Sequence, residues 1–219
     1  MKKKAIIFGT GTLAELVNFY LDNDSTYHVV AFCSTDLETE TFCGKPVINF
    51  LGIEEKFSPS DHEMFIAIGY RQMNTLRKEF CEQSRSKGYK LLSYISSKAT
   101  CWNKNNVIGD NVFIFENNNI QPFVQIEDGV ILWSGNHIGH HSKLKAYSFL
   151  TSHVVVSGFC TIGEQSFLGV NSTIADNLTI GYKALVGAGA VVTKSLSEGQ
   201  VIVSQKSTLL NRSSDYFLR

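Results

Sequence analysis

The sequence predicts two units of different fold class, a small α/β domain with a Rossmann-like parallel sheet and an all-β parallel solenoid of hexapeptide repeats. Three observations predict this division. Strand-like and helix-like segments alternate over residues 1 to about 95, and a glycine turn follows the first strand-like segment. From Ile108 to Val192, every sixth residue is Ile, Leu or Val, at fifteen consecutive positions. We place the two domains at residues 1–96 and 97–219.

The N-terminal domain is predicted to alternate strands and helices, which is typical of a parallel sheet with crossover connections. Helical spacing of apolar residues indicates helices over residues 13–21 and 71–87, the second with Leu76 and Phe80 near one face. Short apolar runs indicate the strands, which we place at residues 4–8, 28–33, 64–69 and 89–95.

The repeat region is predicted to be a coiled solenoid, because neither a helix (period about 3.6) nor a strand (period about 2) explains a period of six. Three hexapeptides give a coil of 18 residues. Gly follows the aliphatic residue six times, and Asn or Gly recurs three places after it, as at Asn111. Such residues tolerate the positive φ of a tight corner. Small or β-branched residues recur four places after the aliphatic, as at Ser142, and are expected to fill the interior.

The two ends of the solenoid are predicted from weaker signals. Trp102 is in phase with the repeat, so we expect the first coil to begin there. Residues 197–219 follow the last repeat and are expected to cap the open end of the solenoid. Asn118 and Asn136 occupy equivalent positions in neighbouring coils, and we interpret them as a buried amide ladder.

The composition gives no support to several classes of partner. The chain has 20 basic and 20 acidic residues, a balance that favours neither nucleic acid nor a membrane surface. No apolar segment approaches the roughly 20 residues of a membrane helix, and the run after Lys2, Lys3 and Lys4 is too short for a signal peptide. Five cysteines without close pairs favour reduced thiols and a cytoplasmic location over disulfides or a zinc site.

The glycine turn of the N-terminal domain is a candidate phosphate site. Gly9, Thr10 and Gly11 lie between a strand and a helix, where backbone N–H groups and the positive helix end attract anions. A tight turn without a ligand is the alternative. An NAD-dependent oxidoreductase would place an acidic residue after the second strand, and Asp36 lies near that position. The domain is short for a full dinucleotide fold, so a nucleotide-sugar diphosphate fits it better.

The third strand ends on the same edge of the predicted sheet. Gly69, Tyr70 and Arg71 follow this strand, and ligands of open α/β sheets bind at this edge. Arg71 is positioned to pair with a diphosphate.

Four of the six histidines lie between His137 and His153. His140 and His141 occupy the second and third places after Ile138, at a corner, and are expected to point outward, where imidazole can act as a general base near neutral pH. His153 lies at another corner and could line a groove. Solvated or interface histidines are the alternative, and so is a carbonic anhydrase-like zinc site, although the clustering lacks metal-ligand spacing.

These features together resemble the two-domain hexapeptide sugar acyltransferases, the family that includes bacillosamine-pathway and sialic-acid-type acetyltransferases. The resemblance covers nearly the whole chain and rests on the Gly-Thr-Gly turn at 9–11, the Gly-His-His-Ser corner at 139–142 and the glycine-rich segment at 180–194. It implies a left-handed parallel β-helix and a homotrimer with active sites between subunits. It further implies that the α/β domain holds a nucleotide-linked amino sugar and that acetyl-CoA lies between adjacent helices.

The resemblance also implies roles for the histidines. His140 matches the family histidine that takes a proton from the sugar amine. The family usually has Asp or Glu at the next position, where this chain has His141. His141 could orient His140, a carboxylate such as Glu116 or Glu127 could do so from another coil, or positioning of the amine could dominate.

The remaining implied contacts concern acetyl-CoA. Val170 and Ala188 match coenzyme-contacting motif positions, and His153 is expected to line the same groove. Gly158 is our candidate for a backbone N–H that stabilises the thioester oxygen. Phe149 stands where the family often has a coenzyme-contacting histidine.

We therefore predict an acetyl-CoA-dependent N-acetyltransferase that acts, without a metal, on a dTDP- or UDP-linked amino-deoxyhexose in lipopolysaccharide or other surface-polysaccharide synthesis. The alternatives are O-acetylation of a sugar hydroxyl, a nucleotide-binding oxidoreductase module trimerised by its solenoid, and a zinc hydratase.

Overall fold

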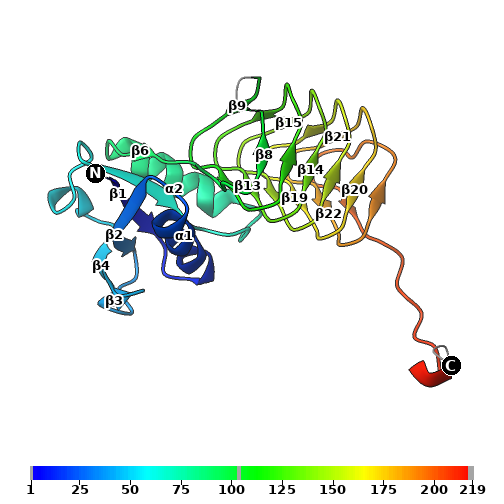
Figure 1. Ribbon diagram of the computed structural model, residues 1–219, viewed down its shortest axis with the longest axis horizontal. Coiled ribbons are helices and arrows are strands. Elements are labelled where there is room, and N and C mark those ends of the chain that lie inside the picture. Colours follow the sequence, from blue (N-terminus) through cyan, green and yellow to red (C-terminus); the bar gives the residue numbers. More distant parts are fainter. Residues whose placement is uncertain (1, 103–104, 217–219) are drawn as a thin grey trace.

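The computed structural model describes residues 2–102 and 105–216 and contains both predicted units in the predicted order. An α/β unit lies at one end of a solenoid of short strands, and the C-terminal segment leaves the other end (Figure 1).

The α/β unit is a six-stranded sheet in the order β3-β4-β2-β1-β5-β6, parallel except for the antiparallel pair β3–β4. Its elements are β1 (Lys3–Phe8), α1 (Thr12–Asn23), β2 (Tyr27–Ser34), β3 (Thr41–Phe42), β4 (Lys45–Asn49), the 3-10 helix η1 (Ile53–Glu55), β5 (His62–Ile66), α2 (Thr75–Ser86) and β6 (Lys90–Leu91). The parallel Rossmann-like sheet is confirmed.

Three details of the predicted α/β unit are wrong. The pair β3–β4 was not predicted, since its strands are short and carry few apolar residues. Helix α2 begins at Thr75, because the preceding residues 72–74 have left-handed φ angles that no helix contains. The strand predicted at 89–95 is divided: β6 joins the α/β sheet, whereas Tyr94 and Ile95 form β7, the first strand of the solenoid.

The solenoid consists of three parallel sheets joined by corners. The first solenoid sheet contains β7 (Tyr94–Ile95), β10 (Phe113–Ile114), β13 (Ile131–Leu132), β16 (Phe149–Leu150), β19 (Phe167–Leu168), β22 (Leu185–Val186) and β24 (Val201–Ile202). The second contains β8 (Thr100–Cys101), β11 (Asn119–Ile120), β14 (His137–Ile138), β17 (Val155–Val156), β20 (Thr173–Ile174) and β23 (Val191–Val192). The third contains β9 (Val107–Ile108), β12 (Gln125–Ile126), β15 (Lys143–Leu144), β18 (Thr161–Ile162) and β21 (Thr179–Ile180).

The predicted register is confirmed by pairing between strands 18 residues apart, as Ile126 with Leu144 and Ile138 with Val156. The aliphatic residues from Ile114 to Val192 stack in one core and are buried. Burial of about 1.5–3 kcal/mol per large aliphatic side chain makes this stack the main stabilising feature of the solenoid. The first coil departs from the prediction: Cys101, not Trp102, pairs with Ile120, and Trp102 is 60% exposed.

The corners have positive φ at the third place after each aliphatic residue from Ile108 to Val186. The fourteen positions are Asn111, Asn117, Phe123, Gly129, Gly135, His141, Tyr147, His153, Phe159, Gln165, Asn171, Asn177, Lys183 and Gly189. The sequence predicts this conformation where Asn or Gly is present. The register imposes it on Phe, Tyr, His, Gln and Lys as well, because every corner must turn the chain in the same way.

The glycines that directly follow the aliphatic residues have a different role from the one predicted. None of them has positive φ. A Cβ at Gly163 would lie 2.5 Å from the backbone of Gly181 in the next coil, and a Cβ at Gly139 would lie 2.5 Å from the backbone of Ser157. Close approach of successive coils, not a left-handed turn, therefore requires glycine there.

The interior asparagines bond to the backbone and not to each other. Asn118 Nδ2 donates to the carbonyls of Phe115 and Trp133, at 2.8 and 2.9 Å. Asn136 Oδ1 accepts the N–H of Val154 at 2.7 Å. The two amides are buried in neighbouring coils as predicted, but the predicted ladder of amide–amide bonds is wrong.

The C-terminal segment covers the solenoid end only in part. Leu196 bridges Ile180, and β24 pairs with β22. Beyond Ile202 the chain leaves the solenoid (Figure 1), residues 203–216 are exposed, and Leu209 is 97% exposed; the 3-10 helix η2 (Ser214–Tyr216) lies in this segment. Within one chain, the residues that cover the solenoid end are thus those before 203, and residues 203–216 do not form the predicted cap.

The two units share one hydrophobic core. Outward-facing aromatic residues of the first solenoid sheet, Phe113 and Phe149, cluster with Ile7, Val17 and other buried residues of the α/β unit. Asp24, at the end of α1, accepts bonds from Tyr94 Oη and the Ser97 N–H, at 2.6 and 2.9 Å. The α/β unit is therefore fixed against the first solenoid sheet. The domain division at residues 96 and 97 stays a prediction.

We predict that Gly163→Ala lowers the free energy of unfolding by about 1–3 kcal/mol, because its methyl group overlaps the backbone of the next coil. Gly187→Ala is the matched control, since a Cβ there lies no closer than 3.2 Å to any other residue. Urea unfolding followed by circular dichroism measures both. Equal losses in the two variants would contradict this account of coil spacing.

Candidate active site

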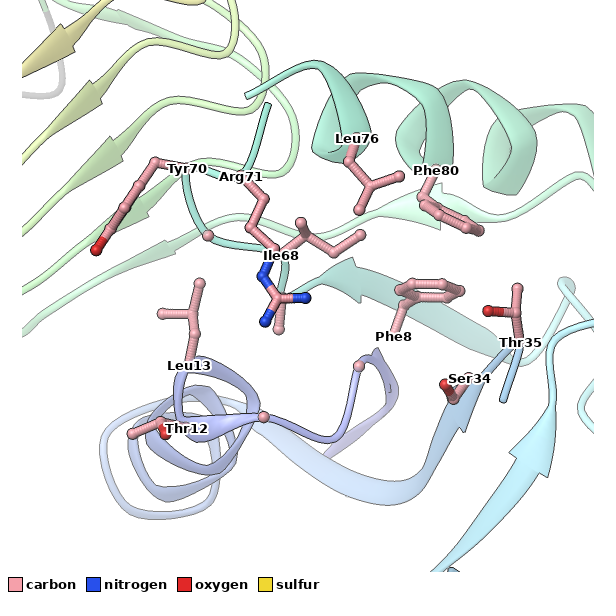
Figure 2. Close-up of a pocket in the computed structure, with 14 residues that line it drawn as sticks. Phe8, Thr12, Leu13, Ser34, Thr35, Ile68, Tyr70, Arg71, Leu76 and Phe80 are labelled. Carbon is pink, nitrogen blue, oxygen red and sulfur yellow. The ribbon is translucent and has the colours of Figure 1, made fainter. Parts of the chain in front are cut away.

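A pocket of about 460 Å³ lies at the carboxyl ends of β1, β2 and β5. Figure 2 shows its wall, with α1 on one side and α2 on the other. The lining residues are Phe8, Gly9, Gly11, Thr12, Leu13, Ser34, Thr35, Ala67, Ile68, Gly69, Tyr70, Arg71, Leu76 and Phe80.

The glycine turn shapes one wall of this pocket. Gly9 has φ of +112°, and a Cβ there would lie 3.2 Å from the carbonyl oxygen of Ala67, so glycine brings the ends of β1 and β5 together. Gly11 is the N-cap of α1, and a Cβ there would meet nothing within 4 Å. The N-terminus of α1 therefore faces open space in the pocket, where its unpaired N–H groups and dipole favour an anion.

Arg71 provides the charge of the pocket. Its guanidinium extends toward the middle of the cavity, between Leu13 and Ile68 (Figure 2). Every other described lining residue is uncharged. The rings of Phe8 and Phe80 lie 4.2 Å apart at the far side and form an apolar wall. A cation, a helix N-terminus and an aromatic wall suit a ligand with an anionic group and a planar ring.

The structure brings together five of the seven predicted sugar-nucleotide residues, namely Gly9, Gly11, Gly69, Tyr70 and Arg71. Thr10 and Asp36 do not line the cavity. Tyr70 turns away from Arg71 (Figure 2), and its ring contacts Phe149 and Phe167 of the solenoid at 5.2 and 5.0 Å.

Sequence reasoning missed Ser34 and Thr35, which line the pocket where β2 ends. Both residues directly follow the strand predicted at 28–33, so their position at the pocket edge could have been predicted. Asp36 was predicted instead because a dinucleotide site would need an acidic residue there.

His140 and His141 lie at the corner between the second and third solenoid sheets, and both are exposed as predicted. Their Nδ1 atoms are 3.1 Å apart, which is hydrogen-bond distance. The His141 ring lies between Phe123 and Phe159, with centroid distances of 4.7 and 4.9 Å. We call Phe123, His140, His141, Gly158 and Phe159 the histidine corner.

Gly158 lies directly beneath the His140 ring. A Cβ at Gly158 would be 2.9 Å from Cε1 and 3.0 Å from Nε2 of His140. Glycine at this position thus lets the ring lie against the next coil with its Nε2 edge over the backbone. The structure thus brings together His140, the predicted base, and Gly158, the predicted oxyanion donor.

The two carboxylates considered as partners of His140 are both bonded elsewhere. Glu116 accepts hydrogen bonds from Tyr20 Oη at 2.8 Å and Ser134 Oγ at 2.7 Å. Burial acts to raise the pKa of Glu116, but these bonds outweigh it and lower that pKa. Glu127 pairs with Lys145 at 2.7 Å. Among residues 2–102 and 105–216, His141 is the residue that lies within hydrogen-bond distance of the His140 imidazole.

The predicted acetyl-CoA residues fall at two corners. Gly158 belongs to the histidine corner, whereas His153, Val170 and Ala188 lie at the corner between the first and second sheets. The His153 ring covers Gly135, since a Cβ at Gly135 would lie 2.5 Å from His153 Nδ1. Phe149 is 1% exposed beneath the α/β unit.

The pocket and the histidine corner face different directions in one chain. The α/β unit packs on the first solenoid sheet. The histidine corner joins the second and third sheets, which makes it the corner opposite the first sheet in a three-sided solenoid. A ligand in the pocket therefore cannot reach His140 of the same chain across the solenoid core.

The described residues contain no group of three or more His, Cys, Asp or Glu that could hold a metal ion. Within the same residues, no helix is sufficiently long and apolar to span a membrane.

Two families match the chain. The PglD N-terminal domain family matches residues 4–84, and the bacterial transferase hexapeptide family (six repeats) matches residues 107–140. These two matches confirm the resemblance to the two-domain hexapeptide-repeat sugar acyltransferases that the sequence predicts. No curated protein sequence matches the chain.

Solved structures match over almost the whole chain. The acetyltransferase domain of PglB from Neisseria gonorrhoeae FA1090 is 26% identical, with a TM-score of 0.84 over 93% of this chain and 97% of that one. The same domain also matches in complex with acetyl coenzyme A, at 25% identity, a TM-score of 0.84 and the same coverage.

PerB from Caulobacter crescentus, in complex with CoA and GDP-perosamine, is 26% identical, with a TM-score of 0.81 over 92% of this chain and 94% of that one. A histidine-to-asparagine form of perosamine N-acetyltransferase from Caulobacter crescentus, also in complex with CoA and GDP-perosamine, is 26% identical, with a TM-score of 0.83 over 92% of this chain and 93% of that one.

These matches confirm the predicted fold, a small α/β domain followed by a left-handed parallel β-helix. They also agree with the predicted enzyme class and co-substrate, since these neighbours are acetyltransferases that bind acetyl-CoA or CoA.

Proposed function

We propose that this protein transfers an acetyl group from acetyl-CoA to the amine of a nucleotide-linked amino sugar. The pocket of the α/β unit would hold the nucleotide diphosphate against Arg71 and the N-terminus of α1. The single observation that carries the proposal is the exposed His140 ring, which lies over Gly158 and bonds to His141 at a corner of an acyltransferase fold.

The proposed assembly is a homotrimer in which each active site is formed by two chains. The pocket and the histidine corner of one chain face different directions, so a second chain is needed to bring them together. Acetyl-CoA would then lie between adjacent solenoids, where Gly158 of one chain and His153, Val170 and Ala188 of the other could contact it.

The proposed mechanism is direct transfer. The amine nitrogen attacks the thioester carbonyl, the carbon–sulfur bond breaks, and the amine proton moves to Nε2 of His140. For Nε2 to accept it, Nδ1 of His140 must carry the ring hydrogen and donate to Nδ1 of His141. The imidazolium can then protonate the departing CoA thiolate, and a backbone N–H at Gly158 would stabilise the developing oxyanion.

The identity of the sugar stays a prediction. UDP- and dTDP-linked sugars are expected from the sequence. A GDP-linked sugar should be tested as well, because PerB from Caulobacter crescentus binds GDP-perosamine. A role in surface-polysaccharide synthesis and a cytoplasmic location are expectations from the sequence alone.

We predict that the full-length protein acetylates the amine of a UDP-, dTDP- or GDP-linked amino sugar, and that His140→Ala lowers kcat by about 10²–10⁴-fold with little change in KM. Acetylated product is measured by mass spectrometry. His28→Ala is the control and should keep full activity, because His28 is exposed at the amino end of β2, whereas the pocket lies at the carboxyl end of that strand. Product on a hydroxyl would favour O-acetylation, and NAD binding without CoA binding would favour the oxidoreductase alternative.

The two-histidine arrangement predicts a specific pH response. His141→Glu places a carboxylate beside His140, which favours the protonated ring, so the acid limb of the kcat/KM profile should move to higher pH. His141→Phe keeps the ring stack but removes the hydrogen bond, and should lower kcat about tenfold without that shift. If neither variant changes the profile or kcat, His141 does not orient His140.

A further inference from the structure

The loop that joins β5 to α2 has an unusual backbone. Gln72, Met73 and Asn74 have φ angles of 53°, 49° and 65° in succession. Left-handed φ is disfavoured for residues with a side chain, and three in a row persist only where the surroundings hold them. The same loop carries Gly69, Tyr70 and Arg71, which line the pocket (Figure 2).

Asn74 attaches this loop to the solenoid. It is the N-cap residue of α2, yet its side chain makes no capping bond to the helix. Its Nδ2 instead donates to the carbonyl oxygens of Gln165 and Ser166, at 3.0 and 3.2 Å, and the residue is fully buried. Gln165 Nε2 donates in return to Thr75 Oγ1 at 2.9 Å.

Arg77, in the first turn of α2, forms hydrogen bonds both to the solenoid and to the pocket wall of the α/β unit. Its Nε donates to the Gly129 carbonyl at 3.0 Å and its Nη2 to the Tyr147 carbonyl at 2.8 Å, both on the solenoid. Its Nη1 donates to the carbonyls of Ile68 and Gly69 in the pocket wall, at 3.1 and 2.9 Å.

The charge of Arg77 is not neutralised by a carboxylate. Among the described residues, its hydrogen bonds all go to backbone carbonyls, and its side chain is fully buried. Burial lowers the pKa of Arg77 to about 10, so the guanidinium stays charged near neutral pH. The guanidinium carbon also lies 5.6 Å from the centroid of the Phe149 ring, a cation–π contact. A buried cation without a carboxylate partner is costly, which argues that the geometry it enforces is useful to the protein.

We infer that Asn74 and Arg77 are positioning residues that clamp the β5–α2 loop to the solenoid and thereby hold Arg71 in place for the diphosphate of the substrate. Neither residue lines the pocket, so both act through the loop. The clamp uses carbonyls of three successive coils, at Gly129, Tyr147 and Gln165, which gives it a rigid base. This inference rests on the proposed function of the pocket.

A preorganised loop should affect the affinity for the nucleotide more than the rate of acetyl transfer. The reason is that the conformational entropy of the loop is already lost in the free protein, before the nucleotide binds. Acetyl-CoA is proposed to bind at the solenoid corners, away from the loop. Loss of the clamp should therefore weaken nucleotide binding and leave CoA binding unchanged.

The test uses the full-length protein and isothermal titration with UDP, dTDP and GDP, followed by CoA. Asn74→Gly removes both side-chain bonds while still permitting positive φ, and Arg77→Lys keeps the charge but loses the forked donors. Both should raise Kd for the best-bound nucleotide about tenfold or more and leave Kd for CoA within about twofold. Asn117→Gly, at an exposed corner with φ of 59°, is the matched control and should change neither.

Two results would overturn the clamp. One is unchanged nucleotide affinity in Asn74→Gly, and the other is loss of nucleotide and CoA affinity together, which would mean that the bonds only maintain the fold. If the unsubstituted protein binds CoA but none of the three nucleotides, the proposed function of the pocket fails, and the clamp fails with it.

Discussion

The buried guanidinium of Arg77 ties the α/β unit to the solenoid through four carbonyl oxygens, two on each side. Around it, Phe113, Phe149 and their neighbours form an apolar contact that both units share. Such an interface has one geometry, because buried hydrogen bonds must all be satisfied together. The pocket therefore has a fixed place relative to every coil of the solenoid.

The fixed placement of the α/β unit determines how the pocket and the histidine corner lie relative to each other. The α/β unit occupies the first solenoid sheet, and the register of the repeat places His140 at the opposite corner. The pocket and the histidine corner of one chain thus face apart, and in the proposed function each is half of an active site. An assembly of identical chains around a closed axis can place the pocket of one chain beside the histidine corner of the next, which explains how each half-site could be used.

The sequence predicts the solenoid well because one six-residue rule determines both burial and corner geometry, and this rule also places His140 and His141 on an exposed corner. It predicts the β5–α2 loop poorly. Residues 71–74 fall within the helix predicted over 71–87, but residues 72–74 have left-handed φ, and bonds from Asn74 and Arg77 to distant coils hold them there. Carbonyl partners carry no sequence signal, so neither residue could be recognised. Trp102 was misplaced because one extra residue in the first coil shifts the phase.

The central claim, that each active site is built from two chains, is tested most directly by hetero-oligomers of two inactive subunits. Arg71→Glu disables the pocket and His140→Ala disables the base, and co-expression with two different tags allows tandem purification of the mixed form. In a mixed trimer, one of the three interfaces pairs an intact pocket with an intact His140, so about one third of the unsubstituted activity should return. Mixed oligomers as inactive as their parents would contradict the claim.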